Sequence, residues 1–133
     1  MSDNFARTDT DISQLLLGNN FKKPNVTIVS GQTITTGMLL GIITASGKLA
    51  QTKSGSVDGS EIPKYIAIAD DDASAGDVVT EVLAFGEVNS EKLVFDGSDT
   101  LETVVSGDTF YNHLRRYGML ALTSEIVNSF DNA

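Results

Sequence analysis

Between residues 31 and 49 the chain is rich in aliphatic side chains, and glycine interrupts this stretch at Gly31, Gly37, Gly41 and Gly47. Glycine inside an apolar run is typical of a bulge or of a close approach between two backbones. Short apolar segments bounded by Gly, Ser and Asp indicate short β-strands joined by tight turns. We therefore predict a mainly β fold, because this stretch offers strands and turns in alternation.

The same pattern continues on both sides of this stretch. Turns are predicted at Ser30-Gly31, Ser46-Gly47 and Asp96-Gly97, and a Ser/Gly/Asp-rich loop over residues 52–61. The predicted strands cover residues 26–29, 34–43, 48–51, 65–69, 78–85, 92–95 and 119–122.

One short helix is predicted near the C-terminal end. Phe110, Leu114 and Tyr117 recur at helical spacing. Asp108 is placed to cap the first turn, and Gly118 to end the helix in a left-handed conformation. The body of the chain is therefore expected to be a β domain with a single helix.

The first 24 residues form a segment of a different kind. Three adjacent leucines fit neither a helical stripe nor the alternation of a strand, so the segment cannot hide them within itself. Either this is a terminus whose leucines pack on the domain, or it is an arm that docks on another chain. The apolar residues expected to carry such docking are Phe5, Ile12, Leu15, Leu16, Leu17 and Phe21.

Composition narrows the class of partner. The 133 residues suffice for one domain, and their hydrophobic content of 41% is ordinary for a globular protein. Eighteen acidic against nine basic residues give a formal charge of -9, which repels phosphate backbones and anionic lipid. The sequence has neither a membrane-spanning apolar run nor a signal-peptide pattern. We expect a protein made in a cytoplasm that binds neither nucleic acid nor membranes.

Candidate chemistry is sparse. The chain has one histidine and no cysteine, which excludes cysteine-based nucleophilic triads and zinc sites built on histidine pairs. His113 is interpreted as a surface or interface residue. Residues 70–72 are three aspartates, followed by Asp77, but they lack the alternate spacing of an EF-type calcium loop and are interpreted as a solvated turn. No two carboxylates stand out as an acid–base pair, so we expect no enzyme, no metal and no cofactor.

Six segments share an order and spacing with a known family. They are GMLLGIITASGK (37–48), DGS (58–60), IAIADDD (66–72), AGDV (75–78), GEVN (86–89) and LRRYGM (114–119). Over residues 26–122 the chain thereby resembles the head decoration proteins of tailed bacteriophages, the family that includes the lambda capsid-stabilising protein.

The resemblance implies a fold, a partner and a place. The fold would be a β-rich small barrel or tulip-like domain over residues 25–133, with one short C-terminal helix and an extended N-terminal arm over residues 1–24. The protein would be a homotrimer on the outer surface of the virion, bound to the major capsid protein at three-fold and quasi-three-fold positions of the expanded head. It would be made in the host bacterial cytoplasm. The arm would be flexible when free and would add a strand to the shell.

Two other classes remain open. The spacing of Gly31, Gly37 and Gly41 also occurs in small β-barrel carriers of biotin or lipoyl groups. Those carriers need a lysine in a hairpin turn, flanked by Met or by Asp and Ala, whereas Lys48 follows Gly47 and precedes Leu49. A glycan- or receptor-binding domain on a virion surface is the second alternative.

Overall fold

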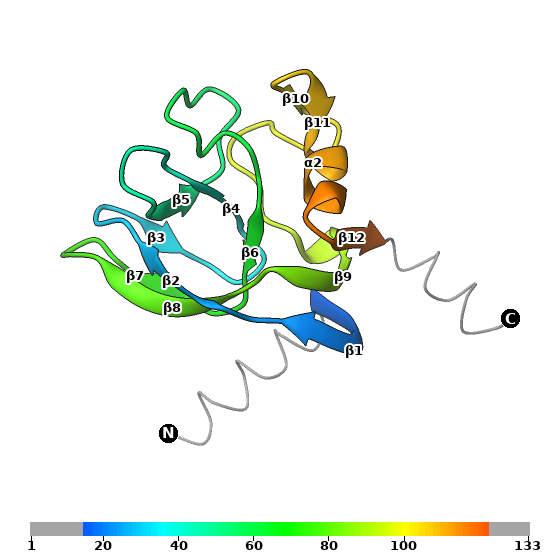
Figure 1. Ribbon diagram of the computed structural model, residues 1–133, viewed down its shortest axis with the longest axis horizontal. Helices are drawn as coiled ribbons and strands as arrows, with labels where there is room; N and C mark the ends of the chain where they lie inside the picture. Colours follow the sequence, from blue (N-terminus) through cyan, green and yellow to red (C-terminus); the bar gives the residue numbers. More distant parts are fainter. Residues whose placement is uncertain (1–14, 123–133) are drawn as a thin grey trace, which may run out of the picture.

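A closed barrel of five short strands forms one half of the molecule (Figure 1). The computed structural model describes residues 15–122. Around the barrel the strands pair in the order β2, β5, β4, β6 and β8, and all pairs except β2–β5 are antiparallel. The prediction of a mainly β barrel is therefore confirmed. The barrel strands are β2 (Asn25–Ile28), β4 (Leu39–Ile42), β5 (Leu49–Gln51), β6 (Tyr65–Ala67) and β8 (Val78–Leu83).

A second sheet and a helix form the other half, at the right in Figure 1. The sheet has the order β1-β9-β12, and the helix α2 (Phe110–Arg116) contacts β12. The single predicted helix is thus confirmed. The other elements are β1 (Leu16–Lys22), β3 (Thr33–Ile34), β7 (Asp71–Asp72), β9 (Phe85–Asn89), the 3-10 helix η1 (Ser90–Lys92), β10 (Val104–Val105), β11 (Asp108–Thr109) and β12 (Met119–Leu122), with β3 paired to β7 and β10 to β11.

The barrel wall separates two hydrophobic cores. Successive side chains of a strand point to opposite faces. Leu40 lies in the core inside the barrel, whereas Leu39 lies in the core between the barrel, the second sheet and α2. Val82 and Leu83 divide between the two cores in the same way. A strand buried on both faces reads as a continuous apolar run, which explains why residues 38–43 do not alternate.

Gly41 marks a close approach between β4 and the loop that follows β5. A Cβ atom at this position would lie 2.3 Å from the backbone oxygen of Ser60 and 2.7 Å from that of Ile62. The predicted close approach is confirmed here, because only a residue without a side chain lets the loop rest on the strand.

Three predicted strands differ in the structure. The strand predicted over residues 34–43 is two strands, β3 and β4, with residues 35–38 between them. Residues 92–95 form no strand: η1 ends at Lys92, and Val94 makes only an isolated bridge to Met38. The chain is fixed there by the backbone N–H of Val94, which donates to the oxygen of Gly37 at 2.9 Å. The predicted strand over 78–85 divides at Ala84, where the chain passes from the barrel into the second sheet.

The N-cap of the helix lies one residue later than predicted. Thr109 is the N-cap, and its hydroxyl accepts from the N–H of Asn112 at 3.2 Å. Asp108 still supports the turn, since its Oδ1 accepts from the side-chain amide of Asn112 at 2.7 Å. The predicted left-handed end is confirmed, because Gly118 has φ +90°.

Candidate functional site

The C-terminal part of the predicted arm lies on the domain as strand β1. β1 pairs antiparallel with β9, with Leu16 opposite Val88 and Lys22 opposite Phe85, and the register shifts between these ends. Segments far apart in the sequence are therefore joined in one sheet, which no local pattern in residues 15–22 could indicate.

Leu15 is part of the core, with only 1% of its surface exposed. Leu16 and Phe21 are half-buried and pack against the same core, and Leu17 is half-buried. Of the two interpretations left open by the sequence, the structure shows the leucines packed on the domain. Phe5 and Ile12 lie outside the described residues. A role of these six residues in binding another chain stays a prediction.

β1 is an edge strand of the second sheet. β9 pairs with one of its sides, and within residues 15–122 no strand pairs with the other. An edge strand presents a row of backbone N–H and C=O groups that can pair with a strand of another chain. This edge strand directly follows the N-terminal segment in the sequence, and it is the part of the predicted arm that the structure describes as a candidate site.

The opposite end of the second sheet carries exposed aromatic side chains. Phe85 is 38% and Tyr117 is 44% exposed. They stand beside Gly118, where a Cβ atom would come within 2.4 Å of the Phe85 ring. Tyr117 lines a hollow of about 240 Å³, and the ammonium of Lys64 lies 5.3 Å from the centre of the Tyr117 ring. The hollow is lined by Ile42, Lys64, Tyr65, Ala84 and Tyr117.

His113 is buried, so its interpretation as a surface residue is wrong. Only 4% of it is exposed, and its Nε2 lies 2.8 Å from the backbone oxygen of Val105. The Arg116 guanidinium lies 3.4 Å from its Nδ1. A carbonyl can only accept and a guanidinium can only donate, so the ring holds its proton on Nε2. The signal was present in the sequence, because His113 follows Phe110 by three residues on the apolar face of the helix.

The aspartates at residues 70–72 do not form the predicted solvated turn, because Asp71 and Asp72 form strand β7, which pairs with β3. Asp70 accepts from the N–H of Thr36 at 2.8 Å, and Asp72 accepts from the N–H of Ser74 at 2.9 Å. The bonds from Ser74 lower the pKa of Asp72. Within residues 15–122 no three metal-ligating side chains gather. Asp70 thus links two segments that are far apart in the sequence, whereas Asp72 accepts within its own turn.

Lys48, the residue weighed as a carrier lysine, is engaged in an ion pair. Its Nζ lies 2.6 Å from Oδ2 of Asp77, whose other oxygen accepts from the N–H of Ser30 at 2.9 Å. The bond from Lys48, followed by that from Ser30, lowers the pKa of Asp77. Asp77 therefore ties the end of β2 to the β4–β5 hairpin.

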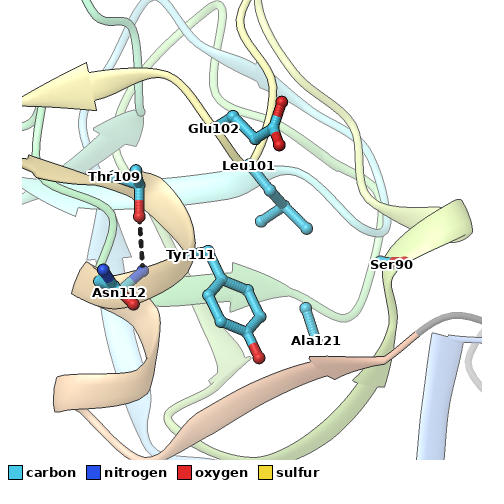
Figure 2. A pocket seen from close by; sticks show the side chains of 7 residues that line it. All are labelled: Ser90, Leu101, Glu102, Thr109, Tyr111, Asn112 and Ala121. Atoms are coloured by element: carbon cyan, nitrogen blue, oxygen red, sulfur yellow. Dashed lines mark hydrogen bonds between the residues drawn. The ribbon is translucent and has the colours of Figure 1, made fainter. Parts of the chain in front are cut away.

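A groove of about 470 Å³ lies between α2, β12 and the loop before β10. Figure 2 shows the side chains of Leu101, Tyr111 and Ala121 converging on it. Its two sides are fastened together, because the N–H of Tyr111 donates to the oxygen of Leu101 at 2.9 Å. Its remaining lining is polar and consists of Ser90, Glu102, Thr109 and Asn112.

Within residues 15–122 no helix has both the length and the apolar content that crossing a membrane requires.

Comparison with protein-family models identifies a matching family. A family model described as bacteriophage lambda head decoration protein D matches residues 11–104, which is more than two thirds of the chain. No curated protein matches the chain. The matched region contains β1 and its partner β9, as well as the whole barrel.

Proposed function

The chain belongs to the bacteriophage lambda head decoration protein family, and from this premise we propose that it binds the exterior of an expanded phage head as a trimer at three-fold and quasi-three-fold sites. The family is structural and associated with the phage capsid. We further propose that the partner is the major capsid protein and that binding stabilises the shell.

The open edge of β1 is the observation that carries this proposal. A strand of the capsid protein can add to that edge and continue the sheet β1-β9-β12 across the contact. Backbone hydrogen bonds then supply the affinity, while the apolar residues upstream fix the position. Phe5 and Ile12 are the large apolar side chains that the arm offers ahead of Leu15.

The burial of Leu15 divides the proposed arm into two parts. Residues 1–14 are the part proposed to reach the shell with Phe5 and Ile12. Leu15, Leu16 and Phe21 act indirectly: they pack β1 on the domain and thereby hold its outer edge in place. Leu17 lies in the edge strand itself, opposite Glu87.

The acidity of the chain supports a place on the outside of the head. Each copy carries a formal charge of -9, so free trimers would be strongly acidic, repel one another and not associate at random. The same charge keeps the protein from binding the DNA that a head encloses. Three arms on one trimer would bind with avidity, so a weak contact for each arm suffices.

Co-sedimentation with undecorated expanded heads tests the proposal. The full chain should pellet with the heads, and electron microscopy should show density at the three-fold and quasi-three-fold positions. A variant without residues 2–14 should keep its fold and lose most of its binding. Deletion of residues 2–24 is a poorer test, because it also removes Leu15 and β1 from the core.

A matched pair of point variants separates the arm from the rest of the surface. Phe5→Ser should weaken binding, whereas Val57→Ser should not, although Val57 is 95% exposed in the loop between β5 and β6. That loop lies at the top of Figure 1 and β1 at the bottom. The proposal fails if the full chain stays in the supernatant. If the chain binds and the variant without residues 2–14 binds equally well, the role holds and the arm is excluded.

A further inference from the structure

The groove between α2 and β12 is a built apolar site that the proposed capsid contact does not use. Leu101, Tyr111 and Ala121 supply its apolar surface, and its volume of about 470 Å³ lies in the range of sites that bury compact ligands. The bonds between the helix start and the preceding loop fix its width: the N–H groups of Phe110 and Tyr111 donate to the oxygens of Thr103 and Leu101, each at 2.9 Å.

The chain leaves the described structure at the wall of this groove. Ala121 lines the groove and Leu122 is the next residue. In the sheet, Leu122 is the register partner of Asn89. Ser90, the residue after Asn89, also lines the groove. The residues after Leu122 therefore continue directly from one wall of this apolar groove.

The sequence after Leu122 has the composition to fill it. Thr123, Ser124 and Glu125 are polar, and Ile126 and Val127 follow, with Phe130 three residues later. Residues spaced by three and four positions share one face of a helix, so these three apolar side chains can form one surface. The eight residues from 123 to 130 span about 26–29 Å when extended and about 12 Å when helical, so they reach the groove in either conformation.

We propose that residues 123–133 fold back into the groove of the same chain and bury Ile126, Val127 and Phe130 against Leu101, Tyr111 and Ala121. The polar residues 123–125 form the reversal. A segment tethered at the groove wall is present at a far higher effective concentration than a second copy or a partner in dilute solution. This inference does not rest on the proposed capsid role.

The charges around the groove orient the segment. Arg115 is exposed and lies on the Tyr111 side, with its guanidinium carbon 5.7 Å from the ring centre. Glu102 lines the groove on the side of Leu101. The acidic residues of the segment, Glu125 and Asp131, are therefore expected on the side of Arg115 and away from Glu102.

Paramagnetic labelling of the full chain tests the proposal. The chain has no cysteine, so Ser129→Cys creates a single site for a nitroxide label. The label should remove most of the methyl NMR intensity of Leu101 and Ala121 in the same molecule. Adding Phe130→Ser to the labelled chain should restore that intensity, since it removes the largest apolar side chain of the segment.

A label in the β4–β5 turn is the matched control. Ala45→Cys places the label on an exposed residue between β4 and β5, two strands that lie away from α2 in Figure 1, and should leave the groove signals unchanged. A second sample mixes spin-labelled chains that carry no isotope label with isotope-labelled chains that carry no spin label. It shows whether the segment in the groove comes from the same chain or from another copy. Signal loss only within one molecule supports the proposal. Signal loss in the mixture would show a second copy in the groove, and no loss in either sample would show an unoccupied one; each result would overturn it.

Discussion

Leu16 and Ala121, which come from opposite ends of the chain, are register partners of the same residue, Val88. β1 runs antiparallel to β9 and β12 runs parallel to it, so β1 begins and β12 ends at the same end of the sheet. The described chain therefore begins and ends at the same end of this sheet, with β9 between its first and last strands. A contact that the arm makes with a capsid would bring the start of the C-terminal segment close to the same shell.

Leu15→Ala tests whether β1 belongs to the free domain. Because Leu15 is 1% exposed, its truncation should lower the free energy of unfolding by about 2–5 kcal/mol in a urea titration. Leu17→Ala is the matched control. Because Leu17 is only half-buried, this variant should lower the free energy of unfolding by less than half of that amount. Equal, small effects of both variants would show that β1 does not contribute to the core.

Gly118→Ala should destabilise the fold by about 1–3 kcal/mol. The residue has φ +90°, and an added Cβ would lie 2.4 Å from the Phe85 ring. Gly76→Ala is the control, since nothing lies within 4 Å of a Cβ atom there; its effect should be within about 0.5–1 kcal/mol of zero. In a double-mutant cycle, Phe85→Ala should relieve the part of the loss that comes from the clash, and strict additivity would contradict that contact.

His113→Phe should lower the free energy of unfolding by about 1–3 kcal/mol, although it keeps a buried ring. The loss arises because the Val105 oxygen no longer receives the hydrogen bond that His113 Nε2 donates at 2.8 Å. His113→Gln retains a donor and should recover part of the stability in the same denaturation experiment. A phenylalanine variant as stable as the parent would refute a structural role for this bond.

Thr52→Val should leave stability unchanged or raise it by up to about 1–2 kcal/mol. Thr52 is 2% exposed, and its hydroxyl finds no hydrogen-bond partner among residues 15–122. Valine replaces that hydroxyl with a methyl group of similar size. Thr52→Ser, which keeps the hydroxyl and removes the methyl, should instead lose about 0.8 kcal/mol. Destabilisation by valine, measured by thermal unfolding, would indicate that the hydroxyl is bonded.

Acid should remove a stabilising contribution from Asp58. The Ser60 hydroxyl at 2.6 Å and the Ser60 N–H at 3.0 Å lower the pKa of this carboxyl below its ordinary 3.8. A pKa lowered by folding means that the ionised form stabilises the fold above pH 3.8 and that this gain is lost as pH falls through the folded value. The stability difference between the parent and Asp58→Asn should therefore be constant above about pH 5 and shrink as the pH falls below 3.8 through the folded value.

Comparing the two proteins at each pH also cancels a general effect. As the pH falls towards the pI of 4.3, the net charge declines and repulsion among the acidic residues weakens, which raises the stability of both proteins. A difference between them that stays constant over the titration would show that Asp58 makes no net contribution.

The sequence predicts the elements that local chemistry determines. The hairpin at Ser46-Gly47 and the helix that ends at Gly118 follow from turn and capping residues that act within a few positions. The burial of Leu15 and His113 does not follow in this way, because it depends on partners such as Val88 and Val105 that other parts of the chain supply. The strand expected over residues 92–95 fails for the same reason, since the bond between Val94 and Gly37 fixes that segment.

The candidate site likewise has one feature that the local sequence indicates and others that depend on distant parts of the chain. The adjacent leucines mark the segment as unusual in the sequence, but the open edge of β1 becomes visible only when β9 is in place beside it. The groove is harder still to foresee, because its lining comes from η1, α2, β11, β12 and the loop before β10.

The two cores on either face of the barrel wall have a consequence for how the protein fails. Leu39 and Leu40 are neighbours in one strand, and each packs in a different core. Loss of either core would therefore expose one face of a strand whose other face belongs to the remaining core. The domain cannot shed its second sheet and keep an intact barrel, and it should unfold in one all-or-none transition. On a shell under internal pressure, each copy would then resist as a unit up to a single limit instead of yielding piece by piece.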